Sequence, residues 1–224
     1  MGQIKDYWWK VLGVALVFYA IVAGLLTDVP KLPILNETIR NLYYHVTMWF
    51  AMMILMTGSV VYSVKYLMGF NIDFDRKARI TAGIGILFGL VGITTGSVWA
   101  QFTWGAFWVN DPKLNGAAIT LLIYLAYIIL RNSLDEEQKR ARLAAVYNIF
   151  AYVLLVVFLM ILPRMTDSLH PGNGGNPAFS SYDLDNDMRK VFYPAIIGWT
   201  LIGVWMGQIR YRFENIEKKL HADD

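Results

Sequence analysis

The sequence predicts an all-α, polytopic membrane protein with six transmembrane helices and both termini in the cytoplasm. Hydrophobic residues make up 56% of the chain and charged residues only 17%. The charges fall in clusters that are separated by long uncharged stretches, each of roughly the 17–25 residues that a helix needs to cross a hydrocarbon core. These stretches are 11–27, 41–64, 80–110, 114–130, 143–163 and 191–209.

The placement of basic residues predicts the orientation of the six spans. Lysine and arginine concentrate in the N-terminal segment, in the connections at 65–79 and 131–142, and in the C-terminal tail. All four segments lie on the same side of the spans, and an excess of positive charge is typical of the cytoplasmic side. Because the bases are divided among short segments, they form no continuous patch, and we do not expect nucleic-acid binding.

The connections are too short to bury a core of their own, so we expect a single domain over residues 1–224. The first apolar stretch has no A-x-A-like site after it and is interpreted as a retained helix. Cysteine is absent. The chain therefore has no thiol redox chemistry, no thiolate metal ligand and no C-x-x-C-H haem attachment site.

The connecting segments carry further signals. Asp73 or Asp75 is expected to cap the third span. The last outer loop, 164–190, includes the proline- and glycine-rich segment 171–177, which cannot form regular structure. The charged tail 211–224 is expected to be a short cytoplasmic helix.

Glycines in the third span follow small-xxx-small spacing, as Gly85/Gly89 and Gly92/Gly96. This spacing lets another helix approach closely, and helix packing is its usual meaning. The alternative is that Gly92 and Gly96, just below the following loop, leave room for the edge of a bulky ligand.

The loop at about 99–115 is the strongest candidate for a binding site. Within ten residues, 104–113, it gathers two tryptophans, a phenylalanine, an acid and a base, and Trp99 and Phe102 precede it. Flat aromatic faces, indole N–H donors and rim charges suit a large, planar, partly charged ligand. The alternative is an interfacial belt that anchors the protein in the membrane.

Two histidines share the predicted side of this loop. His45 begins the second span and His170 lies in the last outer loop, whereas His221 lies in the charged tail. A lone histidine at a helix end is more often a hydrogen-bonded surface group. Neutral imidazole is nevertheless the common nitrogen ligand of haem iron, and one from each side would complete the axial positions. Arg40 or Lys113 would then pair with the haem propionates.

These residues together resemble the haem exporter protein C family of cytochrome c maturation, a branch of the haem-handling membrane proteins with a tryptophan-rich "WWD" loop. The family pattern is W-G-x-x-W-x-W-D followed by a base. The chain supplies most of it with Trp104, Gly105, Trp108, Asp111 and Lys113. Asn110 stands in place of the third tryptophan, which removes one aromatic face.

The histidine segments carry the same resemblance. An arginine followed five residues later by histidine matches Arg40 and His45, and Ser168-Leu169-His170 resembles the second histidine motif of the family. Pro171 follows where a polar residue is more usual. The similarity covers the second to the sixth span.

The resemblance implies a haem-transfer protein without catalytic residues. It implies that haem b is held at the outer face of the bacterial inner membrane, with His45 and His170 as axial ligands. Trp104, Gly105, Trp108 and Asp111 then form the ring platform and docking edge. The implied partners are a periplasmic haem chaperone, the E component, with the ABC transporter A and B components and the small membrane D component.

Three alternatives stay open. A subunit of a cytochrome c synthase would share the tryptophan loop and attach haem to apocytochrome c. A transporter or channel without haem would carry charges inside its spans. A transmembrane b-type cytochrome would need histidines inside the bundle.

Overall fold

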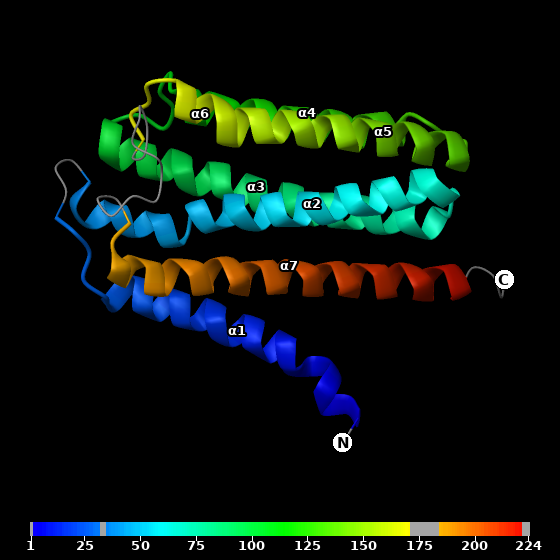
Figure 1. Ribbon diagram of the computed structural model, residues 1–224, viewed down its shortest axis with the longest axis horizontal. Helices are drawn as coiled ribbons and strands as arrows, with labels where there is room; N and C mark the ends of the chain where they lie inside the picture. The colour runs from blue at the N-terminus through cyan, green and yellow to red at the C-terminus, as the bar shows by residue number, and fades with distance from the viewer. Residues whose placement is uncertain (1, 32–34, 171–183, 221–224) are drawn as a thin grey trace.

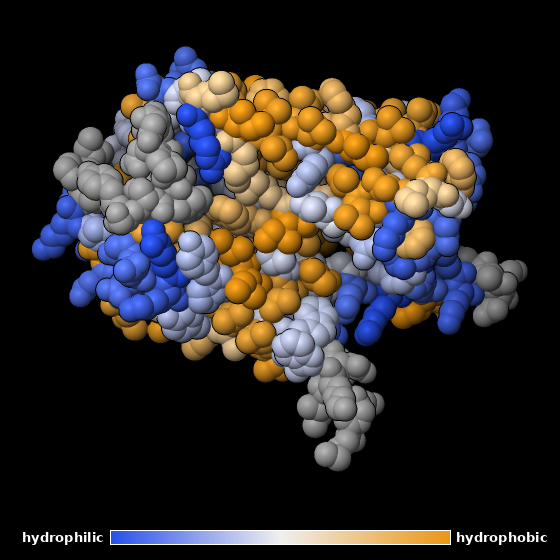
Figure 2. Space-filling view, viewed as in Figure 1, coloured by the Kyte–Doolittle hydropathy of each residue, from blue (hydrophilic) through white to orange (hydrophobic). Residues whose placement is uncertain are grey.

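The computed structural model describes residues 2–31, 35–170 and 184–220, and these residues form helices and connecting loops without a β-strand. Six helical segments are long and apolar enough to cross a membrane, which confirms the predicted all-α fold with six spans. They are Tyr7–Leu26, Asn36–Gly69, Ile72–Trp104, Pro112–Asn132, Glu137–Met165 and Asn186–Leu220. Apolar residues cover the middle of the bundle and hydrophilic residues gather at both ends (Figure 2).

The helices form one bundle with α2 (Val46–Gly69) and α3 (Ile72–Trp104) at its centre (Figure 1). On one side lie α4 (Pro112–Asn132) and α5 (Glu137–Val156), and on the other α7 (Asn186–Leu220) pairs with α1 (Gly2–Leu26). The charged tail is helical as expected as far as Leu220, and it continues α7 without a break because no helix-breaking residue interrupts it. His221 lies outside the described residues.

The four glycines of the small-xxx-small pairs in α3 make room for neighbouring side chains. A Cβ at Gly89 would lie 2.7 Å from Leu121 Cδ2, and a Cβ at Gly85 would lie 2.8 Å from Met56 Cε. At Gly92 the same space holds the Trp49 indole, and at Gly96 it holds the His45 imidazole. Rings of α2 therefore pack against both glycines, as helix packing requires, and Gly96 also lines the cavity described below.

Neither acid proposed as the cap of α3 fills that role. The N-cap is Asn71, whose side chain accepts a hydrogen bond from the Asp73 N–H. Asp75 is buried and forms a bidentate pair with Arg131 of α4, with both N–O distances at 2.7 Å. A side chain directed to a neighbouring helix is no longer available to its own helix end, which explains why that prediction was wrong.

At the end of the bundle opposite the Asp75–Arg131 pair, the regular α-helical winding of α5 stops. The π-helical segment η2 (Val157–Ile161) and the short helix α6 (Leu162–Met165) continue it. The backbone of η2 approaches α4 so closely that a Cβ at Gly116 would lie 2.6 Å from the Phe158 carbonyl oxygen. Single π-helical turns of this kind are frequent at functional sites.

Candidate functional site

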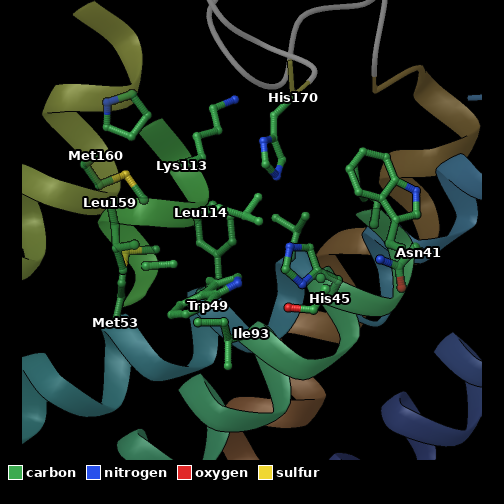
Figure 3. A pocket seen from close by; sticks show the side chains of 18 of the residues that line it. Asn41, His45, Trp49, Met53, Ile93, Lys113, Leu114, Leu159, Met160 and His170 are labelled. Atoms are coloured by element: carbon green, nitrogen blue, oxygen red, sulfur yellow. The ribbon is translucent and has the colours of Figure 1, made fainter. Parts of the chain in front are cut away.

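A cavity of about 210 Å³ lies at the end of the bundle where η2 and α6 meet the loop before α4. A 3₁₀ helix, η1 (Asn36–Tyr43), also lines it. The walls are mostly apolar, with Trp49, Met53, Ile93, Leu114 and Leu159 among them (Figure 3). The polar lining side chains include His45 and His170 from segments far apart in the sequence, which the structure brings to the same cavity.

His45 is the N-cap residue of α2, and its ring packs into the space above Gly96. Its Nδ1 lies 2.8 Å from the Gly92 carbonyl oxygen. A carbonyl oxygen can only accept, so Nδ1 carries the proton and Nε2 keeps a free lone pair. His45 therefore has the tautomer that a metal ligand requires, with its orientation fixed by α3.

His170 is held by Asp111. The Nδ1 atom of His170 lies 2.9 Å from Asp111 Oδ1, and the Asp111 side chain is almost fully buried. The carboxylate again makes Nδ1 the donor and leaves Nε2 with its lone pair. Figure 3 shows His170 reaching into the cavity from the loop side and His45 from the start of α2.

Asp111 is also the N-cap residue of α4. Its side chain accepts hydrogen bonds from the Lys113 and Leu114 N–H groups, and its other oxygen accepts from Ser168 Oγ and the Leu169 N–H. One carboxylate thus fixes the start of a helix and the loop segment that ends in His170.

The electrostatics of this pair favour a neutral imidazole. Burial lowers the pKa of His170 below the usual 6.5, and the hydrogen bond from Nδ1 to Asp111 opposes this shift only in part. Burial raises the pKa of the Asp111 carboxyl, but the hydrogen bonds from His170, Ser168 and Leu169 outweigh it and leave the pKa well below its usual value. At neutral pH the pair is a carboxylate and an uncharged imidazole.

Two tryptophans surround the His170 ring. The Trp104 and His170 ring centres are 4.7 Å apart and nearly perpendicular, and Trp99 lies 5.7 Å from the same imidazole. Trp99 also lines the cavity and donates from its indole to the Thr38 carbonyl of η1. These indoles therefore support the histidine and, through Trp99, one wall of the cavity.

The remaining loop residues have different surroundings. Gly105 ends α3 at a φ of 80°, a left-handed conformation that glycine adopts without steric cost. Trp108 is 44% exposed and lies outside the cavity lining. Asn110, at the position of the family's third tryptophan, accepts a hydrogen bond from the Asn115 side chain.

The two bases expected near the propionates are placed differently. Lys113 lines the cavity. Arg40 instead donates to the Gly24 and Thr27 carbonyls at the end of α1 and pairs with Glu37 at 2.7 Å. Its position thus ties η1, which lines the cavity, to α1.

Sequence reasoning did not single out several residues that line the cavity, with Arg164 and Trp49 among them. Arg164 lines the cavity and is exposed. Like Lys113, it is a base at the outer end of a span, and this position in the sequence could have identified it. Trp49 lies one helical turn after His45, and the spacing of four residues places both on the same face of α2.

Within the ranges that the structure describes, no group of three or more His, Cys, Asp or Glu side chains is placed to hold a metal ion. Two imidazoles alone provide too few ligands, so a metal held between them must bring further ligands of its own, as a porphyrin does.

The chain is similar to known proteins that are named for haem export or for cytochrome c biogenesis. The chain is 24% identical over 218 residues to heme exporter protein C of Rhodobacter capsulatus, which covers 91% of this chain and 88% of that protein. It is 29% identical over 188 residues to heme exporter protein C of Bradyrhizobium diazoefficiens, with 84% and 70% covered. Over 92 residues it is 34% identical to cytochrome c biogenesis protein CcsA of a Synechococcus strain, with 41% and 30% covered.

The family model described as heme exporter protein C matches residues 2–224, which include both histidine segments, the tryptophan loop and all six spans. The chain therefore belongs to the heme exporter protein C family.

Proposed function

We propose that the protein binds haem b between His45 and His170 and presents it to a periplasmic haem chaperone during cytochrome c maturation. The coarser role, haem handling in cytochrome c maturation by a multi-pass membrane protein, follows from family membership and the six spans. The observation that carries the finer proposal is the convergence of two imidazoles on one cavity, each with Nδ1 engaged and Nε2 available.

The cavity fits this ligand in two respects. Its apolar walls suit the porphyrin face, and Lys113 and Arg164 offer positive charge for propionates. Its volume of about 210 Å³ is below the range of about 300–1,000 Å³ that encloses a drug-sized ligand. A porphyrin would therefore extend beyond the cavity, which suits a site that gives its ligand up to a partner.

The proposal extends to orientation and partners. We infer that both termini face the cytoplasm, that the membrane is the bacterial inner membrane and that the histidines lie on the periplasmic side, because basic residues favour the opposite end. The ABC transporter A and B components and the small D component are the proposed membrane partners. The site supplies ligands and positioning, and nothing in it needs to make or break a bond of the substrate.

The visible spectrum of the purified protein tests this function. We expect the band pattern of bis-imidazole haem, and we expect His45→Gly or His170→Gly to remove most of it. Added imidazole should restore the band in each variant, because it fills the vacated coordination position. His221→Ala, in the charged tail, is the control. Full haem content and an unchanged spectrum in both glycine variants would refute the assignment.

A second function, a subunit of a cytochrome c synthase, is favoured by the similarity to the CcsA protein. That similarity covers 41% of this chain, whereas the heme exporter protein C model matches residues 2–224. Incubation of the haem-loaded protein with apocytochrome c and with the chaperone separates the two functions. Thioether formation on apocytochrome c without the chaperone would favour the synthase.

A further inference from the structure

The helices around the cavity leave one side of it open. The backbone of α5 packs against that of α2, but the backbones of η2 and α6, which continue α5, come close within the described chain only to those of α4, α5 and each other. The cavity lies at this level, with Trp49 and Met53 of α2 on one side and Leu159 and Met160 of η2 on the other. Among the described residues, no helix apart from α5 approaches both α2 and η2.

A hydrogen bond marks the lower limit of this opening. Thr57 Oγ1 of α2 lies 2.7 Å from Tyr152 Oη of α5, shortly before η2 begins. On the cavity side of this hydrogen bond, Met53 of α2 and Leu159 of η2 face the cavity from opposite sides, and both are only partly buried. The rims of the opening are therefore apolar side chains within predicted membrane spans.

The lining is graded along the axis of the bundle. Lys113, Arg164 and His170 come from the segments at the loop end, whereas Met53 and Ile93 lie deeper along their spans (Figure 3). A bilayer has the same gradient, since charged groups lie at the headgroups and apolar groups in the hydrocarbon. An amphiphile dissolved in that leaflet, with its carboxylates at the headgroups, would meet the opening already in the orientation that the lining matches.

We propose that the site receives haem sideways from the membrane leaflet at the histidine end, through the opening between α2 and η2. This inference rests on the proposed function, because it takes His45 and His170 as the destination. Haem moves from the hydrocarbon past Met53 and Leu159 with its propionates directed to Lys113 and Arg164. Haem from the water phase would not pass this opening, so the two sources are distinguishable.

The absence of cysteine allows a direct test with a cross-link across the opening. The double variant Met53→Cys/Leu159→Cys is joined by a short bis-maleimide, and the growth of the bis-imidazole band is followed for two haem sources. One source is phospholipid vesicles that contain haem, and the other is haem bound to serum albumin in water. We expect the cross-link to slow loading from vesicles by about tenfold, within the range over which association rates of variants change, and to leave loading from albumin unchanged.

Two controls make the result specific. The cross-linked Thr57→Cys/Tyr152→Cys pair ties α2 to α5 where they already touch and should load normally. If the Met53→Cys/Leu159→Cys protein does not fold, the variant Leu159→Trp places a bulky side chain in the opening instead. Val153→Trp, on the exposed face of α5, is the matched control.

Equal loading of the linked and unlinked protein from vesicles, or equal slowing from both sources, would overturn the lateral route. A missing band in the unlinked protein would refute the haem site itself, and the route with it.

Discussion

The carboxylate of Asp111 joins the start of α4 to His170, whose Nδ1 lies 2.9 Å from Asp111 Oδ1. Carboxylates that orient a metal-binding histidine typically contribute about 10–100-fold to metal affinity. We therefore expect Asp111→Ala to weaken haem binding by about this factor, and Asp111→Asn to lose less, because the amide oxygen still accepts. Haem titration of the purified protein measures this. Asp167→Ala, an exposed acid in the same loop, should bind normally, and an equal loss there would contradict the specific role.

The docked state of His170 is expected to weaken on acidification. Its pKa is lowered from 6.5, so the released loop binds a proton below pH 6.5 while the docked loop resists it. The docking contribution is complete above pH 6.5 and declines as the pH falls through the lowered value. Asp111 acts in the same direction, but only below its ordinary pKa of 3.8. NMR of the three histidine rings measures the midpoint, with His170→Gln for assignment. A His170 midpoint above 6.5 would contradict this prediction.

Gly96 is expected to be intolerant of a side chain. A Cβ there would lie 2.5 Å from His45 Cε1, so Gly96→Ala displaces the imidazole from its place against α3. Overpacking of this kind typically costs about 1–3 kcal/mol, which corresponds to a loss of about 5–150-fold if the cost falls on haem binding. Gly83→Ala, where nothing lies within 4 Å, is the matched control. Normal haem affinity in Gly96→Ala would show that the orientation of His45 is not needed.

The bases of the outer end should differ in their effects. Lys113→Gln and Arg164→Gln are expected to lower haem affinity, Arg164 by no more than an exposed pair allows, about 0–1 kcal/mol. Arg164→Lys should lose part of this, since it keeps the charge without the planar fork. Arg40→Gln is expected to act through stability, because it removes hydrogen bonds to the Gly24 and Thr27 carbonyls. Haem titration and thermal unfolding separate the two effects.

Lys31→Gln is the control for outer-surface charge. If it lowers haem affinity as much as Lys113→Gln, the effect is general electrostatics and the propionate contact must be abandoned.

The two motif tryptophans are expected to separate binding from transfer. Trp104 contacts the His170 ring, and aromatic pairs contribute about 0.5–1.5 kcal/mol, so Trp104→Ala should lower haem retention. Trp108 is 44% exposed, so Trp108→Ala should retain haem and slow delivery to the chaperone. Haem content and chaperone loading measure the two steps. Normal delivery by the double-alanine variant would remove both residues from the mechanism.

The sequence was sufficient for the fold because span length and apolar composition are local properties. The six stretches are visible without knowledge of their neighbours, and the structure confirms six spans. The motif spacing likewise predicted that His45, His170 and Lys113 belong together, and the structure places all three on one cavity.

Span length, composition and motif spacing could not predict the tertiary contacts. The partners of Arg40 at Gly24 and Thr27 depend on how η1 folds back on α1, and the contact of Asp111 with Ser168 joins loops separated by two spans. The pairing of Asp75 with Arg131, in place of a helix cap, depends on the approach of α3 to α4. Such choices are decided by packing between helices, which a local pattern does not contain.

That buried pair has a mechanical consequence for the whole bundle. Asp75 and Arg131 join α3 to α4 at the end opposite the histidines, and removing one partner of such a pair typically costs about 3–5 kcal/mol. At the histidine end, the backbones of η2 and α6 do not come close to that of α2 within the described chain. We therefore expect a motion that admits or releases a large ligand to displace η2 and α6 beside the two imidazoles, and to leave the end held by Asp75 and Arg131 in place.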